Sequence, residues 1–287
     1  MPFLSKRGGN NTAAEVQRWQ YFLRRQGIVQ AGRIDGQFGL KTETATKFFQ
    51  VSQGIAQVSG ELDTITLSAA KQLGYTVRPD NYYDDKRTAS YPRRPKNLKS
   101  PTNGDRNNGL GCFLFKQLPL EHRSDKDEIV ILGSCDKSIS DWRKENIVEV
   151  DINQPIFAAG FNGKITCHRI VAPHIQNLFE RWSELDLLHL IIGYSGSFSP
   201  RYKRGQSPGK GGHGEKRSDQ VSELSNHAFA SAFDINVEDN PFKATPSLCP
   251  ARGSVRELVQ TANDLGFYWG GHFGSPKDGM HFEFADF

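Results

Sequence analysis

The stretch from residue 78 to residue 107 limits what the rest of the chain can fold into. It reads RPDNYYDDKRTASYPRRPKNLKSPTNGDRN, which is rich in proline, asparagine, aspartate and basic residues and has no apolar period. Such a composition is typical of a linker. Because a linker contributes no common core, the 287 residues should form two domains, residues 1–77 and residues 108–287, each with its own core.

The composition is that of a folded protein, with 37% hydrophobic and 24% charged residues. The formal net charge of +4 is small for this length and there is no dense Lys/Arg face, so no nucleic-acid partner is expected. No stretch approaches the ~20 apolar residues of a membrane span, which predicts no membrane insertion. We expect a monomer.

The cysteines and the N-terminus indicate in which cellular compartment the protein is made. Cys112, Cys135, Cys167 and Cys249 are widely spaced and form no C-x-x-C pair, so we expect buried free thiols. The N-terminus lacks the apolar core, about 7–15 residues long, of a signal peptide. We therefore expect synthesis in the cytoplasm without a standard export signal.

Residues 1–77 carry the signals of three short helices. Thr12, followed three positions later by Glu15, predicts a capping box at the start of an amphipathic helix. The turn signal IDGQFG precedes a second helix that should open at Thr42, and a third should span about residues 64–73. Three short helices around one small core predict a three-helix bundle.

The order of motifs in this region resembles a peptidoglycan-binding domain of the kind attached to wall hydrolases. V-x-x-W-Q-x-x-L, D-G-x-F-G-x-x-T, F-Q and G-x-x-D-x-x-T follow one another over nearly all of residues 10–75. The matching positions are Val16, Trp19, Gln20, Leu23, Asp35, Gly36, Phe38, Gly39, Thr42, Phe49, Gln50, Gly60, Asp63 and Thr66. The resemblance implies peptidoglycan as the partner, and most of these residues should build the core and turns rather than contact glycan.

The second domain mixes strand and helix signals. EIVILGS and NIVEVDI are β-rich, VAPHIQNLFERWSEL has an apolar face at helical spacing, and LLHLIIGYSGSF runs from apolar residues into a turn. The final GMHFEF alternates, which sends Met280, Phe282 and Phe284 to the core and His281 and Glu283 to the other face. These signals predict an α+β domain with a mostly antiparallel sheet.

The segment SNHAFASAFDIN, residues 225–236, places Asp234 seven positions after His227 with small and apolar residues between them. Seven residues rise about 10.5 Å in a helix and span about 23 Å in a strand, so the two side chains can share a metal only if the chain turns back. A catalytic zinc typically has three protein ligands. His281 is the candidate third ligand, and the nearby Asp278 is a candidate proton carrier.

The pattern S-x-H, an aspartate seven residues after the histidine, and D-x-x-H-F-E resembles the M15 zinc peptidases, which comprise D-Ala-D-Ala carboxypeptidases and L-alanyl-D-glutamate endopeptidases. GYSGSFSPRYKRG, SNHAFASAFDIN and GFYWGGHFGSPKDGMHFEF follow the family order over most of residues 140–287. The resemblance implies Zn²⁺ held by His227, Asp234 and His281. It also implies Asp278 as the general base and Arg201 as the residue that holds a substrate carboxylate or polarises the substrate carbonyl.

Three further residues are candidates for substrate contact, namely Ser225, Arg204 as the alternative to Arg201, and Glu283. The chain also departs from the family pattern. Ala230 replaces a glycine, Phe273 replaces a tryptophan and Gly279 replaces a proline, and residues 206–224, including His213, form an insertion. None of these departures removes a proposed ligand.

The two resemblances together imply a zinc-dependent peptidoglycan hydrolase that cleaves a stem-peptide bond next to a D-amino acid. It would act as an endolysin-like endopeptidase or a D,D-carboxypeptidase, and binding to the insoluble polymer would raise its local concentration. We expect it to act at the cell wall or periplasm after release by a phage holin or a dedicated secretion machine. The alternatives are a non-catalytic wall-binding protein with a degenerate peptidase fold and a secreted antibacterial toxin that degrades the wall.

Overall fold

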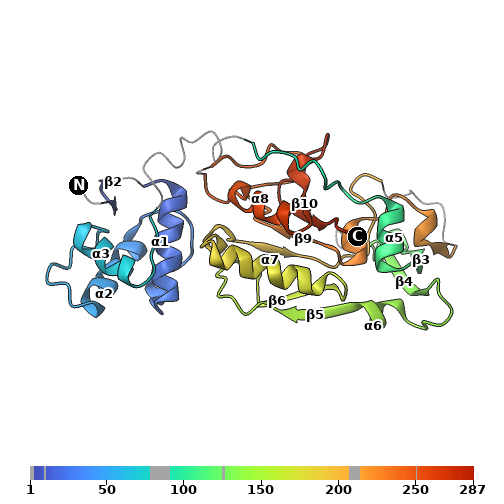
Figure 1. Ribbon diagram of the computed structural model, residues 1–287, viewed down its shortest axis with the longest axis horizontal. Coiled ribbons are helices and arrows are strands. Elements are labelled where there is room, and N and C mark those ends of the chain that lie inside the picture. The colour runs from blue at the N-terminus through green and yellow to red at the C-terminus, as the bar shows by residue number, and fades with distance from the viewer. Residues whose placement is uncertain (1–2, 10, 78–90, 125–126, 207–213, 250) are drawn as a thin grey trace.

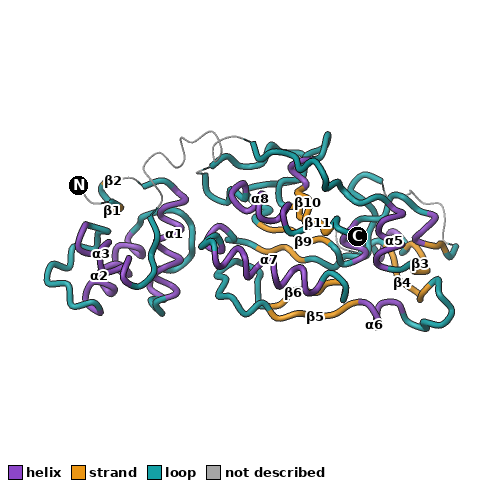
Figure 2. Tube along the Cα trace, in the orientation of Figure 1, coloured by secondary structure: helices purple, strands orange, loops and turns teal. Residues whose placement is uncertain are grey.

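The computed structural model describes residues 3–9, 11–77, 91–124, 127–206, 214–249 and 251–287. A small helical domain at the N-terminal end lies beside a larger domain of helices and strands (Figures 1 and 2). Each domain has a cluster of buried apolar side chains, and the cluster of the larger domain also includes Tyr21 and Ile34 of the helical domain. The chain is therefore α+β with antiparallel strand pairs, as the sequence predicted.

The N-terminal domain is built on helices that pack around Trp19, Phe22 and Phe49. Its elements are α1 (Ala13–Arg25), α2 (Leu40–Ser52) and α3 (Thr64–Gln72), the single turn η1 (Val29–Ala31), and a hairpin of β1 (Leu4–Ser5) and β2 (Gly8–Gly9). The hairpin was not predicted. Thr12 caps α1 as predicted, since its hydroxyl accepts the Glu15 N–H at 3.3 Å, but α2 begins two residues before Thr42.

Two buried glutamines of the peptidoglycan-binding motifs hold the loops of this domain. The Gln20 amide donates to Asp35 Oδ1 at 2.8 Å, and its oxygen accepts the N–H groups of Asp35 and Gly36 at 3.0 Å each. Gln50 plays the same part before α3, where its oxygen accepts the Gly60 N–H at 2.8 Å. Gly36 and Gly60 have φ of +74° and +76°, a region that favours glycine. These motif residues are structural, as expected.

The main sheet of the C-terminal domain has four antiparallel strands in the order β10-β11-β9-β7. The strands are β7 (Tyr194–Gly196), β9 (Ala232–Ile235), β10 (Phe267–Trp269) and β11 (His281–Phe284), and the helices packed on them are α7 (Ala172–Glu184) and α8 (Arg256–Asp264). The predicted apolar face of α7 is buried, with Trp182 against Phe233 and Phe282.

Smaller sheets extend this domain beyond the main sheet. Their elements are β3 (Phe113–Gln117), β4 (Ile129–Ser134) and β8 (Lys216–Arg217) in the order β4-β3-β8, the pair β5 (Ile147–Asp151) and β6 (Lys164–His168), and the helix α6 (Trp142–Asn146). The predicted strands β4 and β5 are present. Part of the 206–224 insertion forms β8, whereas His213 lies outside the described residues.

The linker prediction is wrong for residues 91–107, because they fold onto the C-terminal domain. Tyr91 packs on Trp269, with ring centroids 5.4 Å apart. Helix α5 (Asn103–Leu110) follows, and Thr102 and Asp105 form a capping box at its start. The sequence NGDRNNGL has too few apolar residues to reveal this helix. Residues 78–90 lie outside the described residues.

Helix α1 lies on the side of the helical domain that faces the larger domain (Figure 1), and its side chains contact that domain. Arg18, whose side chain is 3% exposed, forms an ion pair with Asp186. The Tyr21 hydroxyl donates to Pro155 O at 2.8 Å, and the Arg24 guanidinium lies 4.7 Å from the centroid of the Phe157 ring. The polar face of α1 is therefore an interdomain surface, which its sequence pattern alone did not reveal.

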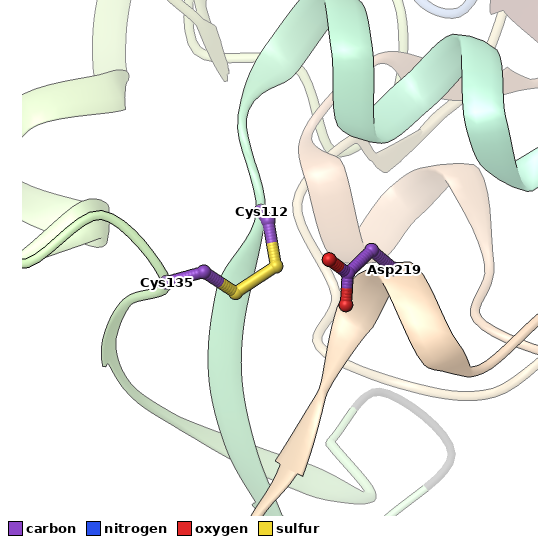
Figure 3. Close-up of side chains that lie close together, drawn as sticks. All are labelled: Cys112, Cys135 and Asp219. Atoms are coloured by element: carbon purple, nitrogen blue, oxygen red, sulfur yellow. A yellow bond between two sulfur atoms is a disulfide. The ribbon is translucent and has the colours of Figure 1, made fainter.

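The expectation of four free thiols is half wrong. Cys167 and Cys249 are free and buried, but Cys112 and Cys135 form a disulfide, as Figure 3 shows. The register of β3 and β4 pairs Phe113 with Ser134, which places the two cysteines opposite each other at the next position with Cα atoms 5.3 Å apart. The 23-residue separation in sequence hid this proximity.

We expect loss of this disulfide to destabilise the C-terminal domain. The bond closes a loop with a sequence separation of 23 residues, so removing it should lower the free energy of unfolding by about 3 kcal/mol. Denaturant unfolding of the Cys112→Ser/Cys135→Ser variant measures the change. Reductant should destabilise the wild-type protein and leave the double variant unaffected, and equal stability of both proteins would contradict the prediction.

Candidate metal centre

The chain turns back between His227 and Asp234, as their sharing of a metal requires. His227 lies in the short 3-10 helix η5 (Asn226–Phe229), and Asp234 lies on β9. The reversal occurs at Ala230, whose φ of +53° is left-handed, and the Ser231 N–H returns to Asn226 O at 3.2 Å. This backbone conformation gives a physical reason for a glycine at the Ala230 position in the family pattern.

Pairing of strands brings His281 to the same place. In the antiparallel register of β9 and β11, His281 is the direct partner of Asp234, so their side chains project from one face of the sheet. His227 Nε2 lies 3.2 Å from His281 Nδ1 and 3.2 Å from Asp234 Oδ1, and the third side, from His281 Nδ1 to Asp234 Oδ1, is 3.0 Å. The three predicted ligands thus form a compact triangle of donor atoms.

Hydrogen bonds fix which ring nitrogen of each histidine faces this triangle. His227 Nδ1–H donates to Ser197 O at 2.8 Å, which leaves the Nε2 lone pair directed at the centre. His281 Nε2–H donates to Glu283 Oε2 at 3.0 Å, which leaves the Nδ1 lone pair of His281 directed at the same centre. Carbonyl and carboxylate partners of this kind are typical of metal-ligating histidines. Zinc ligands at about 2.0–2.1 Å in a tetrahedron lie about 3.3 Å apart, close to the observed spacing.

The electrostatics of the cluster favours a cation. Burial alone would raise the pKa of Asp234, but the imidazoles of His227 and His281 hold it well below its usual value. Burial lowers the pKa of His281, yet the hydrogen bonds to Asp234 and Glu283 outweigh burial and raise it to about 10. The buried carboxylates therefore require positive charge among the three donor atoms. A divalent cation would supply it, and the nitrogen and oxygen donors would suit zinc.

Behind His281 lies a chain of buried polar groups that the sequence analysis did not find. Glu283 was a candidate for substrate contact, but it is 1% exposed and its Oε2 accepts from both His281 and the Asn226 amide. Arg106 of α5, fully buried, donates to Asn226 Oδ1 at 2.9 Å. Burial lowers the pKa of Arg106 and the charge of Glu283 opposes this effect. Glu283 therefore positions His281 and lies within reach of a compensating positive charge.

Asp278 lies beside the two histidines in a cleft, and one of its carboxylate oxygens is free to accept a proton. The cleft has a volume of about 280 Å³ and is lined by Asp278, His227 and His281 among others. Asp278 Oδ1 is buried and has no hydrogen-bond partner. Burial raises the pKa of Asp278 to about 6, with the charge of Asp234 acting in the same direction and that of His281 against it. The carboxyl is therefore deprotonated near neutral pH and can take up a proton there.

The other predicted residues also line this cleft. Arg201 is half-buried, and its Nη1 donates to Tyr202 O at 3.2 Å. Burial lowers the pKa of Arg201, and the charge of Asp234 opposes that effect. Arg204 is exposed at the mouth. Ser225 has a structural part, because its hydroxyl accepts the His227 N–H at 3.3 Å and caps η5.

A second group of metal-capable side chains comprises Cys112, Cys135 and Asp219. Figure 3 shows the two sulfur atoms bonded to each other beside the Asp219 carboxylate. That carboxylate is engaged by Arg217, with Nη2 2.7 Å from Oδ2. Because a disulfide sulfur is not a thiolate ligand, this group is not a metal centre in its oxidised form.

Comparison with protein families gives two matches. Residues 218–284 match the M15 family model described as D-alanyl-D-alanine carboxypeptidase. Residues 8–70 match the model of a peptidoglycan-binding domain. The M15 segment contains the three clustered donors and Asp278, whereas Arg201 and Arg204 precede it. No curated protein and no solved structure matched the chain.

The M15 region and the peptidoglycan-binding domain support a peptidase that acts on peptidoglycan. Among the described residues, every helix is too short or too polar to cross a membrane. The sequence prediction of both families is therefore confirmed, and the structure adds the arrangement of the M15 side chains.

We expect Glu283→Gln to weaken Zn²⁺ binding about 10–100-fold, because the amide still accepts a hydrogen bond from His281 but no longer carries the charge that makes the imidazole a stronger ligand. Competition with a chromophoric chelator measures the affinity. Glu121→Gln, at an exposed acid outside the cleft, is the matched control. An unchanged Zn²⁺ affinity in Glu283→Gln would show that the charge of Glu283 does not strengthen His281 as a ligand.

Proposed function

We propose that this protein is a zinc-dependent peptidoglycan peptidase that cleaves a stem-peptide bond next to a D-amino acid, as an endopeptidase or a carboxypeptidase. One observation carries the proposal. His227, Asp234 and His281 converge within 3.0–3.2 Å of one another, and the two histidines line a cleft that also holds the unpartnered Asp278 oxygen. The match of residues 218–284 to the M15 family model, whose peptidases are generally zinc-dependent, supports it further.

The residues of the cleft divide the chemistry among them. His227, Asp234 and His281 would hold the zinc ion, which when bound supplies a Lewis acid for water activation and carbonyl polarisation. Asp278 takes the proton of the attacking water and delivers it to the leaving amine. Arg201 holds a carboxylate of the peptide through its guanidinium, which orients the scissile bond.

The N-terminal domain keeps the peptidase on its insoluble substrate. Its match to a peptidoglycan-binding domain supports attachment to the polymer, which raises the local concentration of stem peptides at the cleft. We propose action at the wall or periplasm as a monomer, after release by a holin or a dedicated secretion machine, with a phage-type lysin as the first candidate.

The direct test is digestion of purified peptidoglycan with and without a chelator, followed by mass spectrometry of the released muropeptides and metal analysis of the protein. Bound zinc with new amine termini that chelator abolishes is the expected result. Cosedimentation with peptidoglycan without cleavage would instead identify a wall-binding protein with an inactive peptidase fold.

Asp278→Ala should lower kcat by about 10²–10⁴-fold, because proton transfer then depends on solvent. Zinc content and cosedimentation with peptidoglycan should be unchanged, since none of the three clustered donors is altered. The isosteric Asp278→Asn variant should show the same loss and separates the missing base from any effect of side-chain size. Undiminished turnover in both variants would exclude Asp278 as the base.

A further inference from the structure

The cleft of the metal centre adjoins a second cavity of about 370 Å³. Both spaces are lined by Arg201, Lys203, Arg204 and Phe242, and Lys243 lines the second alone. A substrate held at Asp278 and His281 therefore has a neighbouring space that an adjacent part of the same molecule can enter.

The second cavity carries an excess of positive charge. Its cationic side chains are those of Arg201, Lys203, Arg204 and Lys243. Within the described part of the chain, none of the four forms an ion pair with a carboxylate. The acid that lines the cavity, Glu128, uses Oε2 to accept the Tyr202 N–H at 2.9 Å. Cations gathered in a cavity without carboxylate partners attract an anionic ligand.

Phe242 and Lys243 form a defined wall of this cavity. Arg204 Cζ lies 5.8 Å and Lys243 Nζ 5.7 Å from the centroid of the Phe242 ring, within cation–π range. Lys243 has a φ of +75°, unusual for a residue with a side chain, and its N–H donates to Lys277 O at 2.8 Å. Strained residues of this kind cluster at ligand sites.

We propose that the cavity formed by Arg204, Lys243 and Phe242 is a subsite for a second substrate carboxylate, separate from the one held by Arg201. This inference rests on the proposed function. It names the preferred substrate as a peptide with two carboxylates, one beside the cleaved amide and one on a neighbouring residue. Because the cavity shares Arg201 with the catalytic cleft, a single peptide can occupy both.

Two synthetic stem peptides test the subsite. Both peptides keep the carboxylate beside the cleaved amide. The carboxylate on the neighbouring residue is free in the first peptide and a primary amide in the second. The zinc-loaded full-length protein should show at least about tenfold higher kcat/KM with the free carboxylate, as expected for one charge-assisted hydrogen bond. The ratio of the two kcat/KM values should fall toward one in Lys243→Met and be retained in Lys243→Arg.

Control variants keep the test decisive. Lys243→Gly removes the cation, and glycine suits the left-handed backbone conformation at this position. This variant should therefore lower the ratio of the two kcat/KM values even if Lys243→Met disturbs the loop. Lys116→Met, at an exposed lysine of β3, should leave the ratio as in the wild type. Equal kcat/KM for both peptides in the wild type, or an unchanged ratio in both Lys243→Met and Lys243→Gly, would overturn the subsite.

Calorimetric binding of the same peptides separates this inference from the peptidase proposal. Tighter binding of the free carboxylate that Lys243→Gly abolishes, with no cleavage of either peptide, would support the subsite and reject the peptidase. Cleavage of both peptides with equal affinities would reject the subsite and keep the peptidase.

Discussion

The antiparallel register between β9 and β11 is the constraint on which the site depends. It sets Asp234 directly opposite His281, and the left-handed turn at Ala230 brings His227 back to the same point. A shift of one residue would send the side chains of β11 to the opposite face. Since Phe282 and Phe284 are fully packed in the core, the apolar face of the strand fixes the positions of the candidate metal ligands.

The buried carboxylates of the site need hydrogen-bond and charge partners from other parts of the chain. Glu283 is almost completely buried, and a carboxylate there is costly without partners. The chain from Arg106 through Asn226 to Glu283 and His281 supplies those partners. It also gives a reason for α5 to pack on the C-terminal domain, since this helix has few apolar side chains but delivers a buried guanidinium to the site.

In the N-terminal domain, buried polar side chains hold the loops and other side chains make the contact with the larger domain. Its motif glutamines Gln20 and Gln50 are consumed by loop hydrogen bonds, so family resemblance in these positions reports fold rather than direct glycan contact. Its docking on the larger domain uses Arg18 and Tyr21 of α1. The peptidoglycan-binding and peptidase regions therefore meet through specific polar contacts and the apolar packing of Tyr21 and Ile34, in addition to the chain that joins them.

Local patterns in the sequence determined the α+β class, the amphipathic α7, the alternation of β11 and, with the family motifs, the candidate ligands that the structure brings together. Tertiary structure decided what those patterns do not encode, namely the Cys112–Cys135 bond set by the β3–β4 register, the helix α5 and the role of Glu283 behind His281. The physical reason is that apolar periodicity reports which face of an element is buried, whereas hydrogen-bond and charge partners are chosen by elements distant in sequence.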